Sequence, residues 1–196
     1  MEVQNLSIPD VKLIRPTVLR DERGTFSETY SQRAWEAHGF FRRFVQDNHS
    51  LSLQKGVVRG LHFQVPPHAQ DKLVRVTRGS VFDVALDLRV GSPSYGQHVS
   101  AILSAANGLQ MLVPQGFAHG FCTLEPCTEV IYKVTDHYAP ESDRGVLWSD
   151  PRLRIEWPVL SSEALLSPKD QAQPSFAELP VYFQYAPSSM KQDRRP

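Results

Sequence analysis

The sequence predicts a mainly β protein, built as an antiparallel sandwich or jelly roll with a few short helices. Short runs in which apolar and polar residues alternate recur along the chain, and alternation of period two is typical of half-buried strands. Fifteen prolines and eleven glycines punctuate the sequence, and short strands at such spacing indicate a sandwich or barrel. We expect one domain over residues 1–185 and a flexible C-terminal tail over residues 186–196.

The individual elements follow from the local pattern. A helix is expected over residues 31–38, with Ser31 as its N-cap, and a short helical turn over residues 161–166. Strands are expected over residues 72–77, 81–88, 99–104, 110–113 and 129–134, with a turn at residues 78–80.

The strand over residues 81–88 has two polar positions among apolar ones. Asp83, Ala85 and Asp87 share one face, because side chains alternate along a strand. This face is either solvated or part of a polar cavity inside a barrel, in which both faces of a sheet can be enclosed.

Composition and charge exclude several classes of protein. Lys plus Arg and Asp plus Glu number 21 each, so no basic excess suggests a nucleic-acid partner. Cys122 and Cys127 form no CxxC pair, and neither a disulfide framework nor a zinc knuckle is implied. We recognise no signal peptide and no window close to the ~20 apolar residues of a membrane span. We therefore expect a cytoplasmic protein without a membrane partner.

Two histidine motifs are the most informative feature. His62 lies in residues 59–64 and His119 in residues 114–121, and each stands next to glycine in an apolar, β-prone run. A partly desolvated imidazole near neutral pH suits proton abstraction from carbon. The structural alternative is a pair of core histidines satisfied by backbone groups.

The same motifs resemble those of cupin barrels. The matching residues are Gly56 and His62 in the first motif, and Gly108, Pro114, Gly116 and His119 in the second. Gln64 stands where metal cupins have a second ligand histidine, and no glutamate follows before Lys72. Because a redox metal site normally needs three or more protein donors, we expect a cupin barrel that has lost its metal. A metal-dependent oxygenase is the disfavoured alternative.

Nearly the whole chain, from about residue 8 to residue 170, resembles the dTDP-4-dehydrorhamnose 3,5-epimerase family of sugar-nucleotide enzymes. The matching segments are residues 21–28, 45–50, 56–64, 66–75, 113–121, 132–135, 148–151 and 166–170. The resemblance implies conversion of a dTDP-4-keto-6-deoxyglucose to the L-rhamno-configured ketone. It also implies a homodimer and no cofactor.

The resemblance assigns the proton-transfer groups. It makes His62 the base and Asp170 the carboxylate that orients it. Tyr132 matches the acid on the opposite face of the sugar, and Lys72 matches the cation beside the developing enolate. His119 matches a second pocket histidine near the sugar. Taken alone, Tyr132 reads as a core tyrosine, Lys72 as a solvated strand lysine and Asp170 as a turn cap.

The resemblance also assigns the nucleotide site. Arg23, Arg59 and Lys169 are candidates for the diphosphate, since arginine suits phosphate geometry, and Tyr138 matches an aromatic residue that stacks on the base. Further residues around the nucleotide are Phe26, Glu28, Gln46 and Asn48. In this family part of the segment around Phe26 is contributed across the dimer. Asp143, where many members have Glu, and Asp71, where Gly is common, are departures from the family pattern.

One geometric expectation concerns Arg59 and His62. They are three residues apart, so a regular strand would point them to opposite faces. If both line one cavity, the strand must be interrupted, and Gly60 is the expected place for a bulge. Otherwise Arg59 is structural.

Three alternatives remain beside the double epimerase and the oxygenase already mentioned. The chain could epimerise only C3 or only C5 of another deoxysugar, or it could be a non-catalytic cupin that binds sugar nucleotides. Retention of His62, Tyr132, Lys72 and Asp170 argues against the binder.

Overall fold

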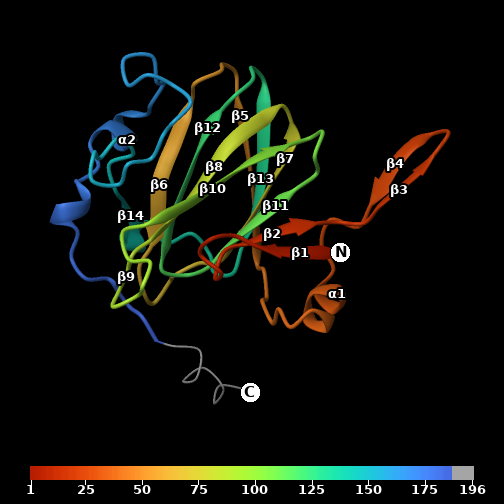
Figure 1. The fold of residues 1–196 in the computed structure, drawn as a ribbon, viewed down its shortest axis with the longest axis horizontal. Helices are drawn as coiled ribbons and strands as arrows, with labels where there is room; N and C mark the ends of the chain where they lie inside the picture. Colours follow the sequence, from red (N-terminus) through yellow and green to blue (C-terminus); the bar gives the residue numbers. More distant parts are fainter. Residues whose placement is uncertain (187–196) are drawn as a thin grey trace.

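The computed structural model describes residues 1–186, in which two antiparallel sheets lie face to face (Figure 1). The six-stranded sheet has the order β1 (Glu2–Asn5), β2 (Lys12–Arg15), β11 (Gln110–Val113), β7 (Lys72–Arg78), β13 (Thr128–Val134) and β5 (Gln46–Ser52). The five-stranded sheet has the order β10 (His98–Ser104), β8 (Ser80–Asp87), β12 (Phe117–Thr123), β6 (Val58–Gln64) and β14 (Asp143–Gly145). The predicted mainly β, antiparallel architecture is confirmed.

The expected strands all form, with ends that differ by at most one residue. Helix α1 (Gln32–Ala37) begins after Ser31, whose hydroxyl accepts a hydrogen bond from the Ala34 amide as predicted. The helical turn expected over residues 161–166 is wrong. Residues 161–163 form a turn without continuing into a helix, and Leu165 makes a parallel bridge to Val57. Three short helical elements were not expected: α2 (Pro168–Gln171), η1 (Pro140–Ser142) and η2 (Phe176–Glu178).

The main core lies between the two sheets. Val74 and Val130 of the six-stranded sheet pack in one cluster with Ala85 and Phe121 of the five-stranded sheet. Ala85 shares its face of β8 with Asp83, so this face points into the sandwich, and Asp83 is fully buried. The prediction that this face of the strand is enclosed is therefore confirmed, and the alternative that it is solvated is wrong.

The outer faces of both sheets are also covered. Phe63 of β6 packs against Tyr182 and Phe183 of the C-terminal segment, with ring centroids 5.6 and 6.1 Å apart. This segment ends in β15 (Phe183–Gln184), which pairs in parallel with β9 (Arg89–Val90). On the other sheet, the buried Trp35 of α1 covers the outer face. In the five-stranded sheet, the main core covers one face and the C-terminal segment packs on the other, so every residue of β12 is buried.

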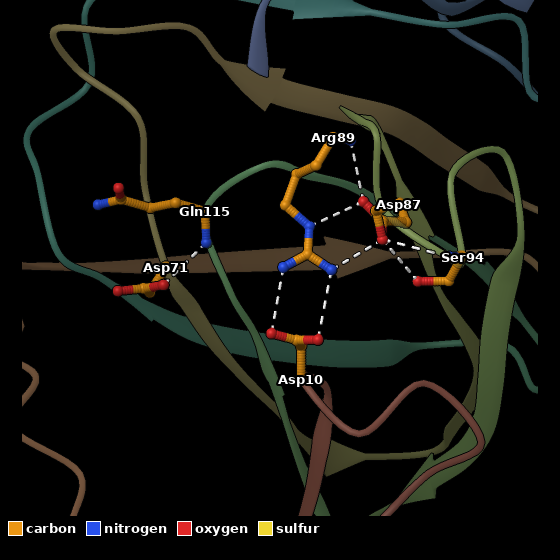
Figure 2. A network of polar contacts seen from close by, with 7 residues as sticks. Asp10, Asp71, Asp87, Arg89, Ser94 and Gln115 are labelled. Atoms are coloured by element: carbon orange, nitrogen blue, oxygen red, sulfur yellow. Dashed lines mark hydrogen bonds and ion pairs between the residues drawn. The ribbon is translucent and has the colours of Figure 1, made fainter. Parts of the chain in front are cut away.

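A buried ion-pair network joins distant loops (Figure 2). The Arg89 guanidinium donates to both oxygens of Asp87, at 2.9 and 2.7 Å, and to both oxygens of Asp10, at 3.1 and 3.3 Å. The hydroxyls of Ser92 and Ser94 also donate to Asp87. Because Asp87 is fully buried, its charge depends on these partners.

Strand β6 is interrupted at Gly60. Its pairing with β12 shifts between His119 and Phe121, so two residues of β6 lie opposite one residue of β12. Gly60 has φ +122°, and a Cβ atom there would lie 2.6 Å from the Cα atom of Gly120. Glycine is therefore required for the two backbones to approach. The bulge expected at Gly60 is therefore present, although Arg59 does not line the same cavity as His62.

One hairpin projects away from the sandwich. Strands β3 (Val18–Asp21) and β4 (Gly24–Ser27) pair only with each other, and Figure 1 shows them extending outward from the N-terminal strands. Leu19 and Phe26 are partners across this hairpin and are 61% and 70% exposed. Among residues 1–186, no helix is long and apolar enough to cross a membrane.

Candidate active site

A cavity of about 140 Å³ between the two sheets is lined by half of the predicted site residues. Its lining comprises Gln46, Asn48, His62, Phe63, Gln64, Gln70, Lys72, Tyr132, Tyr138 and Asp143. A larger groove of about 820 Å³ lies beside the β3–β4 hairpin, but it holds none of these groups. The side chains predicted to act in catalysis therefore gather at the smaller cavity and not at the larger groove.

His62 lies on β6 and is paired with a distant carboxylate. Its Nε2 atom is 2.5 Å from Oδ1 of Asp170, which is 108 positions away in the sequence and only 3% exposed. Ser167, the N-cap of α2, donates its hydroxyl to the other oxygen of Asp170 at 2.8 Å. Burial favours the neutral form of Asp170, but the hydrogen bonds from His62 and Ser167 outweigh burial and lower the pKa of the carboxyl. Because a carboxylate only accepts, Nε2 carries the hydrogen, and in the neutral ring Nδ1 then holds the lone pair.

Lys72 begins β7 in the opposite sheet. Its ammonium donates to the backbone carbonyl of His62 at 3.2 Å. Burial lowers the pKa of Lys72 to about 8, and the negative charges of Asp143 and Asp83 oppose this shift. The structure therefore places the Lys72 ammonium beside His62.

Tyr132 lies on β13, also in the sheet opposite His62. Its pKa is raised, chiefly because it is buried, while the charge of Arg59 acts in the other direction. Its phenol therefore stays protonated at neutral pH and is available as a proton donor. His62 and Tyr132 thus line the cavity from two different sheets.

His119 lies directly opposite His62 in the β6–β12 pairing and is buried. Its Nε2 atom is 2.9 Å from Oδ1 of Asp83, and Oδ2 of Asp83 has no hydrogen-bond partner within the described chain. His119 is therefore anchored behind the cavity lining by a side chain, not by backbone groups. In the sequence, Asp83 was distinguished only as a polar strand position, although a carboxylate on a face that can be enclosed was a usable signal.

Gln64 has a structural role. Its amide nitrogen donates to the carbonyls of His68 and His137 at 2.7 and 3.1 Å, and its oxygen accepts from the Ala139 amide at 2.8 Å. These bonds hold the two loops that border the cavity. Within residues 1–186, no group of three or more His, Cys, Asp or Glu side chains could hold a metal ion.

The cavity mouth carries a second polar cluster. Oδ2 of Asp143 accepts from the Tyr138 hydroxyl at 3.0 Å and from the Lys169 ammonium. The Tyr138 amide donates to Gln46 at 3.1 Å, and Gln46 donates to Asn48 at 2.9 Å. Five of the predicted nucleotide-site residues therefore form one connected group.

The remaining predicted residues lie outside the cavity lining. Arg59 donates across to β5, to the Ser52 hydroxyl at 3.3 Å and the Leu51 carbonyl at 3.4 Å. Arg23 pairs with Asp21 on the exposed tip of the β3–β4 hairpin. Phe26 and Glu28 are exposed on the same segment. The structure of one chain does not bring this segment to its own cavity.

Comparisons with known proteins agree with this geometry. The sequence profile of the dTDP-4-dehydrorhamnose 3,5-epimerase family matches residues 5–178. The chain is 56% identical over 185 residues to such an epimerase from Sinorhizobium fredii, covering 94% of both chains. It is 54% identical over 179 residues to that of Pseudomonas aeruginosa, covering 91% of this chain and 97% of the relative.

Solved structures agree as well. A dTDP-6-deoxy-D-glucose-3,5-epimerase from Legionella pneumophila, in complex with dTDP-4-keto-L-rhamnose, superposes with a TM-score of 0.89 at 44% identity. The match covers 94% of this chain and 98% of that one. ChmJ, a 3'-monoepimerase from Streptomyces bikiniensis in complex with dTDP-quinovose, superposes with a TM-score of 0.81 at 30% identity, covering 88% of this chain and 87% of that one. Because the profile and these relatives each match nearly the whole chain, the protein belongs to the dTDP-4-dehydrorhamnose 3,5-epimerase family.

Proposed function

We propose that the protein is an isomerase that epimerises dTDP-4-dehydro-6-deoxy-D-glucose at C3 and C5 to dTDP-4-dehydro-L-rhamnose. The observation that carries the proposal is the placement of His62 and Tyr132 in one cavity on opposing sheets. Inversion at carbon requires loss of a proton from one face and its return from the other. A sugar held between the two sheets meets one group on each face.

His62 is the base in this mechanism. Its Nδ1 lone pair removes the proton next to the 4-keto group, and Asp170, bonded at Nε2, stabilises the imidazolium that forms. Lys72 stabilises the negative charge that develops on the keto oxygen as the enolate forms. Tyr132 then delivers a proton from the opposite sheet.

The nucleotide part of the substrate extends over the cavity mouth. Tyr138 is 57% exposed beside Asp143 and offers a ring face for base stacking. Arg59, with Lys169, supplies positive charge for the diphosphate. The enzyme needs no metal or other cofactor in this mechanism, because an acid, a base and a cation suffice for the proton transfers.

The active unit in this proposal is a homodimer. Arg23 and Phe26 stand on a projecting hairpin with an exposed apolar face, beside a groove of about 820 Å³. A second copy that packs against this hairpin would bury its apolar face. It would also receive Arg23, Phe26 and Glu28 at its own cavity.

Mixing two inactive variants tests the shared site. His62→Ala and Arg23→Ala homodimers should each be impaired, but a mixed dimer carries one intact site. Random reassociation of equal amounts should restore about a quarter of the wild-type activity. No recovery, in a sample shown to exchange subunits, would place Arg23 at the cavity of its own chain.

Proton NMR in deuterated water with the 4-keto sugar nucleotide tests the reaction. Deuterium at both C3 and C5 with inversion supports the double epimerase. Exchange at one position only means a single-position epimerase, and no exchange means a non-catalytic binder. We further propose a cytoplasmic location, in line with two cysteines that are both free thiols.

A further inference from the structure

Asp143 joins two separate walls of the cavity mouth. It begins β14, and its Oδ2 atom accepts from Tyr138, in the loop after β13, and from Lys169, in α2. The Asp143 side chain is only 12% exposed, whereas Lys169 is 53% exposed. One mostly shielded carboxylate oxygen therefore holds two side chains that come from different elements of the chain.

The same carboxylate faces Lys72 inside the cavity. The charged groups acting on Lys72 are Asp143 on β14, Asp83 on β8 and Lys169 on α2. His62 and Tyr132 line the same cavity, and His119 is bonded to Asp83. Asp83 is bonded to His119, and Asp143, which lines the cavity, is bonded to Tyr138 and Lys169.

The electrostatic effect of Asp143 on Lys72 follows from this placement. Burial is the main influence and lowers the pKa of Lys72 to about 8. Asp143 is the strongest charge that opposes burial, and Lys169 acts in the direction of burial. Without the carboxylate, burial and the neighbouring ammonium of Lys169 would drive Lys72 further toward its neutral form.

Taking the epimerase function as its basis, we propose that Asp143 is a positioning residue with two linked tasks. It ties Tyr138 and Lys169 together over the cavity, and it supplies the counter-charge that keeps the Lys72 ammonium charged beside the enolate. This role is specific to the carboxylate and not to its length, so the Glu found at this position in many family members would also serve.

The direct test is the titration of Lys72 itself. NMR of protein labelled with ¹³C at lysine Cε follows each ammonium, and Lys72→Met assigns the signal. Asp143→Asn should lower the Lys72 midpoint by roughly one pH unit, as expected for the loss of a nearby opposite charge. Lys169→Gln should raise the midpoint, because the like charge is removed. Asp143→Glu should restore a midpoint close to that of the wild type.

Glu129→Gln is the matched control. It removes the same charge from an ion pair with Arg78, 3.2 Å long, outside the cavity, and should leave the Lys72 midpoint in place. The alkaline limb of kcat for epimerisation should move with the midpoint, to lower pH in Asp143→Asn and to higher pH in Lys169→Gln.

Two outcomes would overturn the inference. One is a Lys72 midpoint that does not move in Asp143→Asn. The other is an equal shift in Asp143→Glu and Asp143→Asn, which would point to packing and not to charge. The titration needs no substrate, so it separates this inference from the proposed function. A wild-type protein that exchanges no substrate proton would refute the epimerase alone.

Discussion

Replacing Asp170 by Asn tests how the His62–Asp170 pair contributes to proton abstraction. In the proposed mechanism the His62 imidazole starts neutral, and in the transition state it becomes an imidazolium beside the carboxylate. The variant therefore removes an attraction that exists mainly in the transition state. Two unit charges with centres about 4 Å apart interact by about 4 kcal/mol at an effective dielectric constant near 20. At about 1.36 kcal/mol per decade of rate, kcat should fall by about 10³-fold.

The surroundings of Asp170 allow the substitution without loss of fold. Asn has nearly the same size, its carbonyl oxygen still accepts from Nε2 of His62, and the Ser167 hydroxyl can rotate to accept from the new amide. Asp150→Asn is the matched control. Asp150 is also buried and accepts backbone hydrogen bonds from Arg152 and Phe176, but it lies outside the cavity lining.

The assay combines deuterium exchange at C3 and C5, the rate of epimerisation and thermal unfolding of both variants. Asp170→Asn should lose exchange at both carbons together, while its affinity for free dTDP stays close to that of the wild type. Asp150→Asn should lower the melting temperature, because two hydrogen bonds to the carboxylate are weakened, and should leave kcat unchanged. If kcat decreases by less than tenfold in a folded Asp170→Asn protein, Asp170 does not have the assigned role of stabilising the His62 imidazolium.

Three further predictions concern other parts of the molecule. Tyr132→Phe should still exchange a proton at one carbon at least, without inversion, because His62 can return a deuteron to the same face; inversion of both centres at the normal rate would exclude Tyr132 as the acid. Arg59→Ala should weaken the binding of free dTDP by roughly 1.5–3 kcal/mol, measured by calorimetry, since a charge-assisted contact is lost; an affinity within about twofold of the wild type contradicts this. Arg89→Met should lower the free energy of unfolding by roughly 3–5 kcal/mol in urea, because Asp87 is left buried without its partner; the further change Asp87→Asn should recover part of the loss, and no recovery would argue against the buried charge as the cause.

Local patterns were enough to predict five strands, β7, β8, β10, β11 and β13. Strand β8 shows why: Phe82 and Val84 alternate with Asp83 and Ala85, and this alternation requires an extended chain with two distinct faces. Ser31 likewise marked the start of α1 by a local capping bond. Helix α2 was missed, although Ser167 followed by Pro168 and Asp170 is a local capping signal of the same kind. The expected boundary at residue 185 stays a prediction, since residues 187–196 lie outside the described chain.

Other features depended on contacts between residues far apart in the sequence. No local pattern reveals that Gln64 hydrogen-bonds to two loops; in the sequence it is only a residue that stands in place of a metal ligand. The pattern also cannot reveal that Asp143 bonds to both Tyr138 and Lys169, because these residues meet only when β14, α2 and the loop after β13 pack around the cavity.

The sequence by itself determined the strand pattern, the two histidine motifs and the need for a break at Gly60. These depend on side-chain alternation and on backbone freedom, which neighbouring residues encode. Tertiary structure alone decided that His62 and Tyr132 face one cavity from opposing sheets. It also decided that the β3–β4 hairpin projects from the sandwich and adds no residue to the lining of that cavity. It also placed Asp170 against His62 across 108 positions of sequence. Such pairings form only when the two sheets close over their common core, because packing, and not local propensity, sets the distance between residues so far apart along the chain.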